Sequence, residues 1–118
     1  DLPQVRARAP QLRQAVLHCL QFAMDAVGHM EVESDRTVQL EASAEGDRVQ
    51  ITISHSGLAF EHPERAFDPF LAPQVGSHEG AGLGLSLCAT ILRENRGSAS
   101  AMNLQPRGAA IVLELRAA

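Results

Sequence analysis

Three glycines on alternate positions, Gly80, Gly82 and Gly84, run directly into an apolar helical pattern that includes Cys88 and Leu92. Glycine lacks a Cβ, so such a stretch can turn sharply and bring its backbone close to a ligand. The N-terminus of a helix adds unpaired N–H groups and the positive end of a dipole, which together attract phosphate. The same pattern also fits a tight turn before a helix, and both interpretations stay open on these residues alone.

The spacing of the glycines excludes two common phosphate-binding loops. The dinucleotide fingerprint needs GxGxxG after a strand, whereas this stretch has GxGxG and no clear strand leads into it. A Walker loop continues from its last glycine to Lys and then Ser or Thr, but Gly84 is followed by Leu85 and Ser86. The stretch therefore belongs to neither class.

A second group of candidate residues lies on a long helix predicted from Gln11 to Val27, with Gly28 as its stop. Apolar residues with i, i+3, i+4 spacing form its core stripe: Leu12, Ala15, Val16, Cys19, Leu20, Ala23, Met24 and Val27. His18, Phe22 and Asp25 share another face of this helix. We expect that face to lie away from the core, with His18 and Asp25 in solvent. The alternative is that it lines a site.

The rest of the chain supplies a sheet and a second helix. Alternating apolar residues predict two strands, from Val38 to Ala44 and from Val49 to Ile53, joined by a turn at Glu45-Gly46-Asp47. The second strand is expected to end in a turn at Ser54–Gly57, followed by a short helix around Glu64–Phe67 and a loop.

The glycine stretch and its helix follow, closed by Asn95-Arg96-Gly97. A closing hairpin is predicted over Ser98–Asn103 and Ala109–Arg116. This order predicts an α+β fold, a two-layer α/β sandwich with helices on one face of a mixed sheet.

Composition narrows the possible partners. At 118 residues the chain predicts a single domain over 1–118, and with no Met before Asp1 we expect it to be part of a longer protein. A net charge of −4 with no basic stripe argues against nucleic acid, and no apolar run is long enough to insert in a membrane. Cys19 and Cys88 fall in apolar stripes as small buried hydrophobes, which suits a reducing cytoplasm.

The order of elements and motifs resembles the ATP-binding catalytic domain of sensor histidine kinases, members of the GHKL superfamily with its Bergerat fold. The resemblance rests on a lead strand at Leu2–Val5, an N box within Gln14–Ala26, a first glycine box at Ser54–Phe60, an F box at Phe67–Phe70 and a second glycine box at Gly80–Leu85. The F box and the second glycine box, which includes Leu83, match the family pattern intact.

The resemblance implies ATP and magnesium as cofactors, and several positions depart from what that chemistry needs. Phe22 stands where the family has the Asn that helps to hold magnesium, and His18 replaces the other Asn of the N box. Phenylalanine offers no oxygen, and magnesium needs oxygen ligands. His55 replaces the Asp that accepts a hydrogen bond from the adenine amino group, and Ala59 replaces a glycine two residues after the retained Gly57. The lid segment 71–79 lacks Lys and Arg.

We therefore expect a pseudokinase-type domain with no catalytic residue, no metal and no cofactor, and with Phe22 filling the vacated pocket. Its expected partners are protein: its own dimerisation and histidine domain, a receiver domain or another kinase. The alternative is an active ATP-dependent histidine kinase in which His55 accepts adenine and Asp25 is the nearest oxygen donor. A phosphotransfer protein and a relative of the anti-sigma serine kinases are further alternatives. No histidine of the chain lies in the phospho-acceptor context of such kinases.

Overall fold

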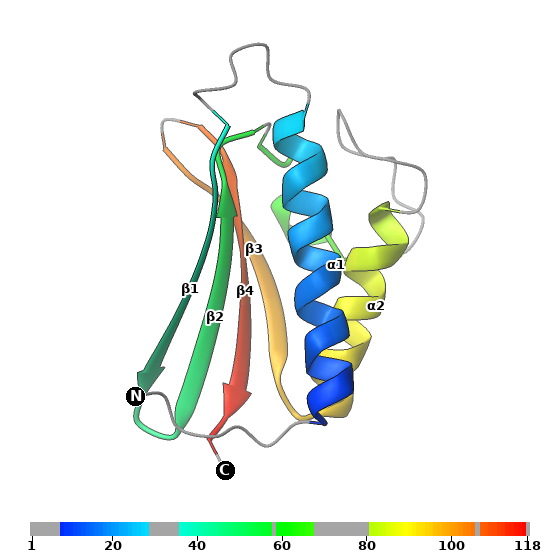
Figure 1. Cartoon of the computed structure of the whole chain (residues 1–118), viewed down its shortest axis with the longest axis vertical. Helices are drawn as coiled ribbons and strands as arrows, with labels where there is room; N and C mark the ends of the chain where they lie inside the picture. Colours follow the sequence, from blue (N-terminus) through cyan, green and yellow to red (C-terminus); the bar gives the residue numbers. More distant parts are fainter. Residues whose placement is uncertain (1–7, 29–35, 58, 68–80, 106, 118) are drawn as a thin grey trace.

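The computed structural model describes residues 8–28, 36–57, 59–67, 81–105 and 107–117 (Figure 1). Along these residues the chain forms α1 (Ala9–Gly28), β1 (Val38–Glu45), β2 (Arg48–His55), the short 3-10 helix η2 (Pro63–Arg65), α2 (Ala81–Glu94), β3 (Ser98–Asn103) and β4 (Ala109–Arg116). Both α-helices cover the same face of the sheet (Figure 1). The predicted α+β two-layer sandwich is confirmed.

The described strands form one sheet with the order β1-β2-β4-β3, and each neighbouring pair is antiparallel. In the register of β1 with β2, Leu40 lies opposite Ile53, and in that of β2 with β4, Ile53 lies opposite Ile111. Period-2 alternation therefore carries these residues to the helix-covered face. The strand predicted over Leu2–Val5, which would make the sheet mixed, lies outside the described residues.

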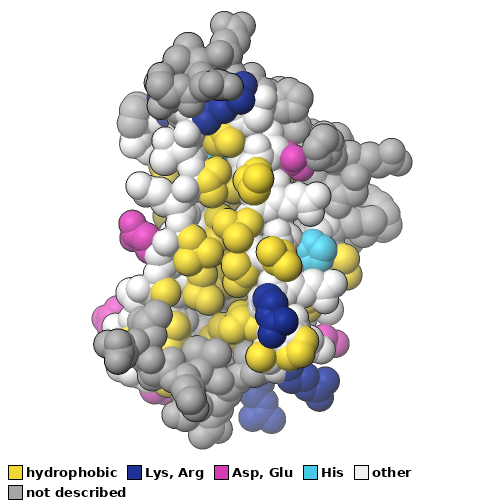
Figure 2. Space-filling model, in the orientation of Figure 1, with side chains coloured by type: hydrophobic (Ala, Val, Ile, Leu, Met, Phe, Trp, Pro, Cys, Tyr) yellow, Lys and Arg dark blue, Asp and Glu magenta, His cyan; other side chains and the backbone are white. Residues whose placement is uncertain are grey.

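The hydrophobic core lies between the sheet and the two helices. Its fully buried members include Ile53, Leu85, Leu92, Ile111 and Leu113. The face shown in Figure 2 carries a band of hydrophobic side chains along the seam between the sheet and α1. Helix α1 therefore covers the centre of the sheet more completely than its β1 edge, where Leu40 is 48% exposed.

The buried face of α1 differs from the predicted one. The face that carries Phe22 was expected to lie away from the core stripe, but only 5% of Phe22 is exposed and it belongs to the main core cluster, which agrees with the expectation that it fills the vacated pocket. Met24, assigned to the core stripe, is 62% exposed. This difference comes from tertiary packing, because the segment after β2 places Phe60 and Ala66 in the same core cluster as Phe22. The buried face of α1 therefore includes Phe22.

Several element ends also shift relative to the predictions. Helix α2 already begins at Ala81, so Gly82 and Gly84 lie within its first turns rather than in a turn before it. Strand β2 continues through His55, and the short helix expected at Glu64–Phe67 is the 3-10 turn Pro63–Arg65. The hairpin turn at Gly46 and both closing strands lie where they were predicted.

The predicted stop of α2 at Asn95-Arg96-Gly97 is confirmed in detail. The N–H of Gly97 donates to the carbonyl of Leu92, and the N–H of Arg96 donates to that of Arg93. This pair of bonds is a Schellman motif, with Arg96 at the left-handed position at φ 61°. Asn95 then links the two helices, because its Nδ2 donates to Gln11 Oε1 at 2.9 Å.

Candidate functional site

Three rings meet between α1 and the end of β2, and we call Phe22, His55 and Phe60 the aromatic cluster. Phe22 stacks on Phe60 with ring centroids 5.3 Å apart and planes 6° apart. The edge of His55 approaches Phe22 at a centroid distance of 6.0 Å and an angle of 64°. At most 5% of any of the three residues is exposed. The cluster is therefore a packed part of the core, as we expected for Phe22 in a filled pocket.

The hydrogen bonding of His55 fixes its tautomer. Its Nδ1 accepts a bond from the N–H of Gly57 at 3.0 Å, so the ring proton of the neutral form lies on Nε2. Burial lowers the pKa of His55 from its ordinary value of 6.5, which keeps the ring neutral. Nε2 is buried and has no hydrogen-bond partner among the described residues. The free nitrogen of His55 is therefore a donor.

Two backbone contacts position this cluster. A Cβ at Gly57 would lie 2.5 Å from the carbonyl oxygen of Ala26, so only glycine allows the chain after β2 to pass this close to the end of α1. Asn103 at the end of β3 binds both backbone groups of Phe60: Oδ1 accepts from its N–H at 2.8 Å and Nδ2 donates to its carbonyl at 2.9 Å. Together these contacts hold Phe60 over Phe22.

Two of the remaining predicted residues, His18 and Gly84, face one another across the seam between α1 and α2. His18 Nδ1 is 3.4 Å from where a Cβ of Gly84 would stand, and His18 Nε2 is buried without a partner among the described residues. Leu85 is 2% exposed and lies in the core. Asp25 is half-buried rather than in solvent.

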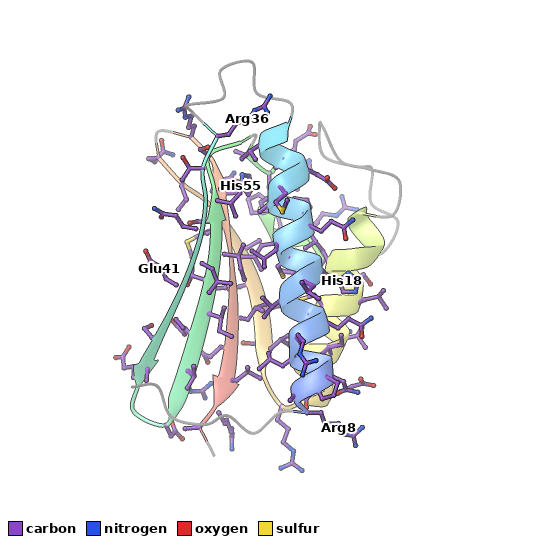
Figure 3. All side chains as sticks on the ribbon, viewed as in Figure 1. Arg8, His18, Arg36, Glu41 and His55 are labelled. Carbon is purple, nitrogen blue, oxygen red and sulfur yellow. The ribbon has the colours of Figure 1, made fainter. Side chains whose placement is uncertain are left out.

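In Figure 3 His55 lies on the sheet side of α1 and His18 lies lower on the helix, so the two histidines are not adjacent. Ala59 is half-buried in the segment that follows β2. Gly82 and Leu83 belong to α2, but their side-chain environments, like Gly80 and the lid, lie outside the described residues. The structure thus places Phe22 with His55, and His18 with Gly84.

Phe60 and Asn103 are site residues that the sequence analysis did not select. Phe60 stood within the first glycine box, but nothing in that motif indicates that it stacks on Phe22. Asn103 lies 43 residues further along the chain, and its spacing carries no signal of a contact with Phe60. Such a pairing arises only when β3 and the segment after β2 are brought together by the fold.

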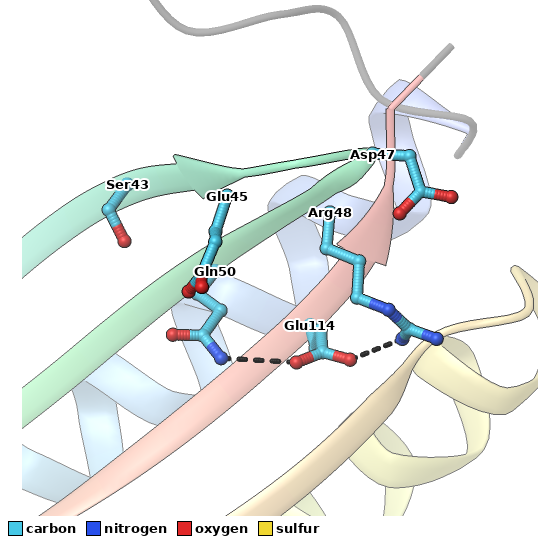
Figure 4. Close-up of a pocket in the computed structure, with 6 residues that line it drawn as sticks. All are labelled: Ser43, Glu45, Asp47, Arg48, Gln50 and Glu114. Carbon is cyan, nitrogen blue, oxygen red and sulfur yellow. Dashed lines mark hydrogen bonds and ion pairs between the residues drawn. The ribbon is translucent and has the colours of Figure 1, made fainter.

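Two surface hollows lie at opposite ends of the sheet. One, of about 290 Å³, is lined by Ser43, Glu45, Asp47, Arg48, Gln50 and Glu114 near the β1–β2 hairpin (Figure 4). The other, of about 360 Å³, adjoins the aromatic cluster, because His55 lines it together with Gln39, Ser54 and Arg107. No group of three or more His, Cys, Asp or Glu among the described residues is arranged to hold a metal ion.

Comparison with known proteins places this arrangement in a family. The sequence model of the histidine kinase-, DNA gyrase B-, and HSP90-like ATPases matches residues 7–118. The chain belongs to this ATPase family. Its curated relatives include the sensor histidine kinase ZraS of Escherichia coli O157:H7, which is 30% identical over 114 residues, 97% of this chain and 24% of ZraS. The chain thus spans about a quarter of the length of that relative.

Solved histidine kinases share the fold of this ATPase-family domain. The nucleotide-free catalytic domain of ThkA has a TM-score of 0.77 at 22% identity, covering 96% of this chain and 70% of that one. ThkA in complex with the response regulator TrrA has a TM-score of 0.75 at 20% identity, with coverage of 97% and 30%. ShkA in complex with AMPPNP has a TM-score of 0.70 at 30% identity, with coverage of 99% and 24%.

The family model shows that the domain is a histidine kinase-, DNA gyrase B-, and HSP90-like ATPase domain, and the relatives named above are sensor histidine kinases. These likenesses say nothing about whether the site of this domain holds nucleotide. Within the described part of the chain, neither α-helix has the length and apolar character that crossing a membrane requires.

Proposed function

We propose that this ATPase-family domain is degenerate, binds nucleotide weakly or not at all, and acts as a regulatory protein-interaction module of a two-component sensor kinase. The observation that carries the proposal is the burial of Phe22. At the position where the resemblance places a magnesium-holding Asn, a phenyl ring is stacked on Phe60 and sealed against His55. This ring offers no oxygen to a metal and occupies space that a ligand would need.

The tautomer of His55 supports the same proposal. The family position accepts a hydrogen bond from the adenine amino group, and a neutral imidazole has one acceptor nitrogen. In His55 that nitrogen is already bonded to the N–H of Gly57, so the other nitrogen presents a donor to an incoming amino group. The alternative in which His55 accepts adenine would have to break this bond and change the tautomer.

The part of the family site that the domain retains contributes too little free energy to make up for the lost metal ligand and adenine acceptor. The glycine box at the start of α2 keeps its backbone N–H groups, and a helix-end dipole contributes about 0.3–1 kcal/mol to an exposed charge. Micromolar affinity corresponds to about −8 kcal/mol. Without a metal ligand and an adenine acceptor, most of that free energy has no source in the described residues.

The proposed partners are proteins of the same pathway. A receiver domain is one candidate, because ThkA is seen with a response regulator. The dimerisation and histidine domain of its own longer chain, or another kinase, are the others. We place this module in the cytoplasm with those partners.

The test is thermal unfolding of the 118-residue chain with and without ~1 mM Mg-ATP, repeated with ADP and with EDTA in place of magnesium. We expect no change in the unfolding midpoint. A ligand at about 100 times its dissociation constant would stabilise the domain by roughly 2.7 kcal/mol, or a shift of about 10 °C. A magnesium-dependent shift of that size would overturn the proposal and favour the alternative of an active kinase. Nucleotide binding is known in a protein of this fold, because ShkA is seen in complex with AMPPNP.

Restoring the family residues provides the positive arm. The double variant Phe22→Asn with His55→Asp should gain a magnesium-dependent shift, because it returns an oxygen ligand and an adenine acceptor. Phe22→Leu with His55→Leu is the matched control, since it also opens the cluster but restores neither the oxygen ligand nor a hydrogen-bond acceptor for adenine. Equal shifts in the two double variants would contradict the proposed cause of the loss.

A further inference from the structure

The two cysteines of the chain face one another across the α1–α2 seam. Cys19 Sγ and Cys88 Sγ are 3.3 Å apart, with one thiol donating to the other, and both residues are fully buried. They are separated by 69 positions in the sequence. Neither belongs to the aromatic cluster, and neither was selected as a site residue, although Cys19 lies within the N-box range Gln14–Ala26.

The helices hold this pair at a fixed level of the seam. On one side Gly84 packs against His18, and on the other Asn95 Nδ2 donates to Gln11 Oε1. The contacts run from 11 with 95 to 18 with 84, so the helices are antiparallel; Cys88 lies between the two contacts on α2, and Cys19 directly follows His18 on α1. Cys19 also lies midway along a row of small buried side chains with Ala15 and Ala23, which lets the backbones approach.

We propose that Cys19 and Cys88 are a redox-sensitive modification site, a dithiol that a hydroperoxide converts to a disulfide joining α1 to α2. Forming the bond brings the sulfurs from 3.3 Å to about 2.05 Å, a closure of little more than an ångström. The inference does not depend on whether the domain binds nucleotide.

The chemistry balances with one equivalent of oxidant. One thiolate attacks the hydroperoxide and becomes a sulfenic acid, releasing the alcohol, or water when the oxidant is hydrogen peroxide. The second sulfur attacks the sulfenic sulfur, the S–S bond forms, and the hydroxyl leaves as water with the second thiol proton. The two thiols thus lose two protons and two electrons, and the two electrons reduce the peroxide.

Burial sets the rate of this reaction. The hydrogen bond with Cys88, burial and the neighbouring sulfur all raise the pKa of the Cys19 thiol far above its ordinary range, so the closed seam contains little thiolate. Oxidation therefore proceeds when α1 and α2 separate locally and expose the thiols. The disulfide that forms then links the two helices covalently. The site thereby couples the redox state to the mobility of the helices that carry Phe22 and Gly84.

The test treats the reduced 118-residue chain with hydrogen peroxide at a temperature below its unfolding transition. Free thiols are then alkylated in denaturant and counted by intact mass spectrometry. We expect a product that has lost two hydrogens, carries no alkyl group and reverts with dithiothreitol. Its unfolding midpoint should rise by about 10 °C, because a cross-link closing a loop of this length restricts the unfolded chain. Mild urea should accelerate the reaction.

Cys19→Ala and Cys88→Ala are the controls and should show no rise in midpoint after the same treatment. If either variant fails to fold, the mass measurement on the wild type still tests the proposal. The 118 residues contain no other cysteine, so a product that has lost two hydrogens and takes up no alkyl group must contain the Cys19–Cys88 disulfide. The proposal is overturned if both thiols stay free while glutathione in the same tube is fully oxidised. Sulfinic acid as the product, or a disulfide that lowers the midpoint, would overturn it equally.

Discussion

Strand β2 begins and ends in opposite chemical environments. At its beginning, Arg48 and Gln50 donate to the carboxylate of Glu114 in an exposed network near the hairpin (Figure 4). At its end, His55 is buried against Phe22, and within the described part of the chain its side chain has one hydrogen bond, from the N–H of Gly57. The exposed end has more polar contacts, and the buried end excludes water.

This difference indicates where the stability of the domain resides. Bonds from Gln50 and Arg48 lower the pKa of Glu114, but water competes for every group in that network. The buried end has no such competition, so its packing and its few hydrogen bonds carry more free energy. Two of the predicted departures from the ATPase pattern, Phe22 and His55, fall at that buried end, so they change the core as well as the candidate site.

The largest expected effect comes from removing the phenyl ring at the buried end. Phe22→Ala should lower the free energy of unfolding by about 3–5 kcal/mol, because it leaves a cavity between Phe60 and His55. Met24→Ala, on the same helix but exposed, should change it by less than about 0.5 kcal/mol. The free energy of unfolding of both variants is measured by urea denaturation. Similar losses of this free energy in the two variants would contradict the larger contribution of the buried ring.

An intermediate effect is expected from two amide side chains that donate hydrogen bonds at opposite ends of the sheet. Asn103→Ala removes both bonds to the backbone of Phe60 and should cost about 1–3 kcal/mol, since these groups are partly buried. Gln50→Ala removes a bond to an exposed carboxylate and should leave the urea midpoint within experimental error. A larger loss for Gln50→Ala than for Asn103→Ala would reverse the comparison.

The smallest expected effect is the acid sensitivity that His55 confers. Its pKa in the folded state lies below the ordinary 6.5, so the unfolded state takes up the proton first as the pH falls. The stability tied to the neutral ring is complete above about pH 6.5 and is lost as the pH falls through the folded pKa. His55→Gln should therefore show a shallower loss of unfolding free energy between about pH 7 and pH 5.

The control for this titration is Met24→Gln, which changes an exposed residue, introduces no titratable group and should keep the wild-type slope. The free energy of unfolding is measured by urea denaturation at each pH for all three proteins. If His55→Gln and wild type lose stability in parallel, the neutral, buried state assigned to His55 is wrong.

Local sequence patterns were sufficient for most of the fold. The turn around Gly46, the strands Ser98–Asn103 and Ala109–Arg116, and the end of α2 at Asn95 follow from residues close to one another in sequence. Their signals are turn chemistry, period-2 alternation and helix capping, all of which act within a few residues. The motifs that indicate the ATPase family are equally local.

The candidate site was only partly predictable. The sequence selected Phe22 and His55 and predicted that Phe22 fills a vacated pocket, but it did not give the neighbours of Phe22 and left the hydrogen bonding of His55 open. The stacking of Phe60 on Phe22 joins residues 38 positions apart, and Asn103 reaches Phe60 across 43. Helical periodicity gives the angle between two faces of α1, but it does not say which neighbours will cover each face.

By itself, then, the sequence determined the order of the described elements and the family, and it predicted that Phe22 and His55 replace oxygen-bearing residues of the family site. Only the tertiary structure decided that Phe22 is buried, that His55 presents a donor, and that Cys19 touches Cys88. The physical reason is range: propensity and capping depend on neighbours in the chain, whereas burial, tautomer and thiol contact depend on segments that packing brings together.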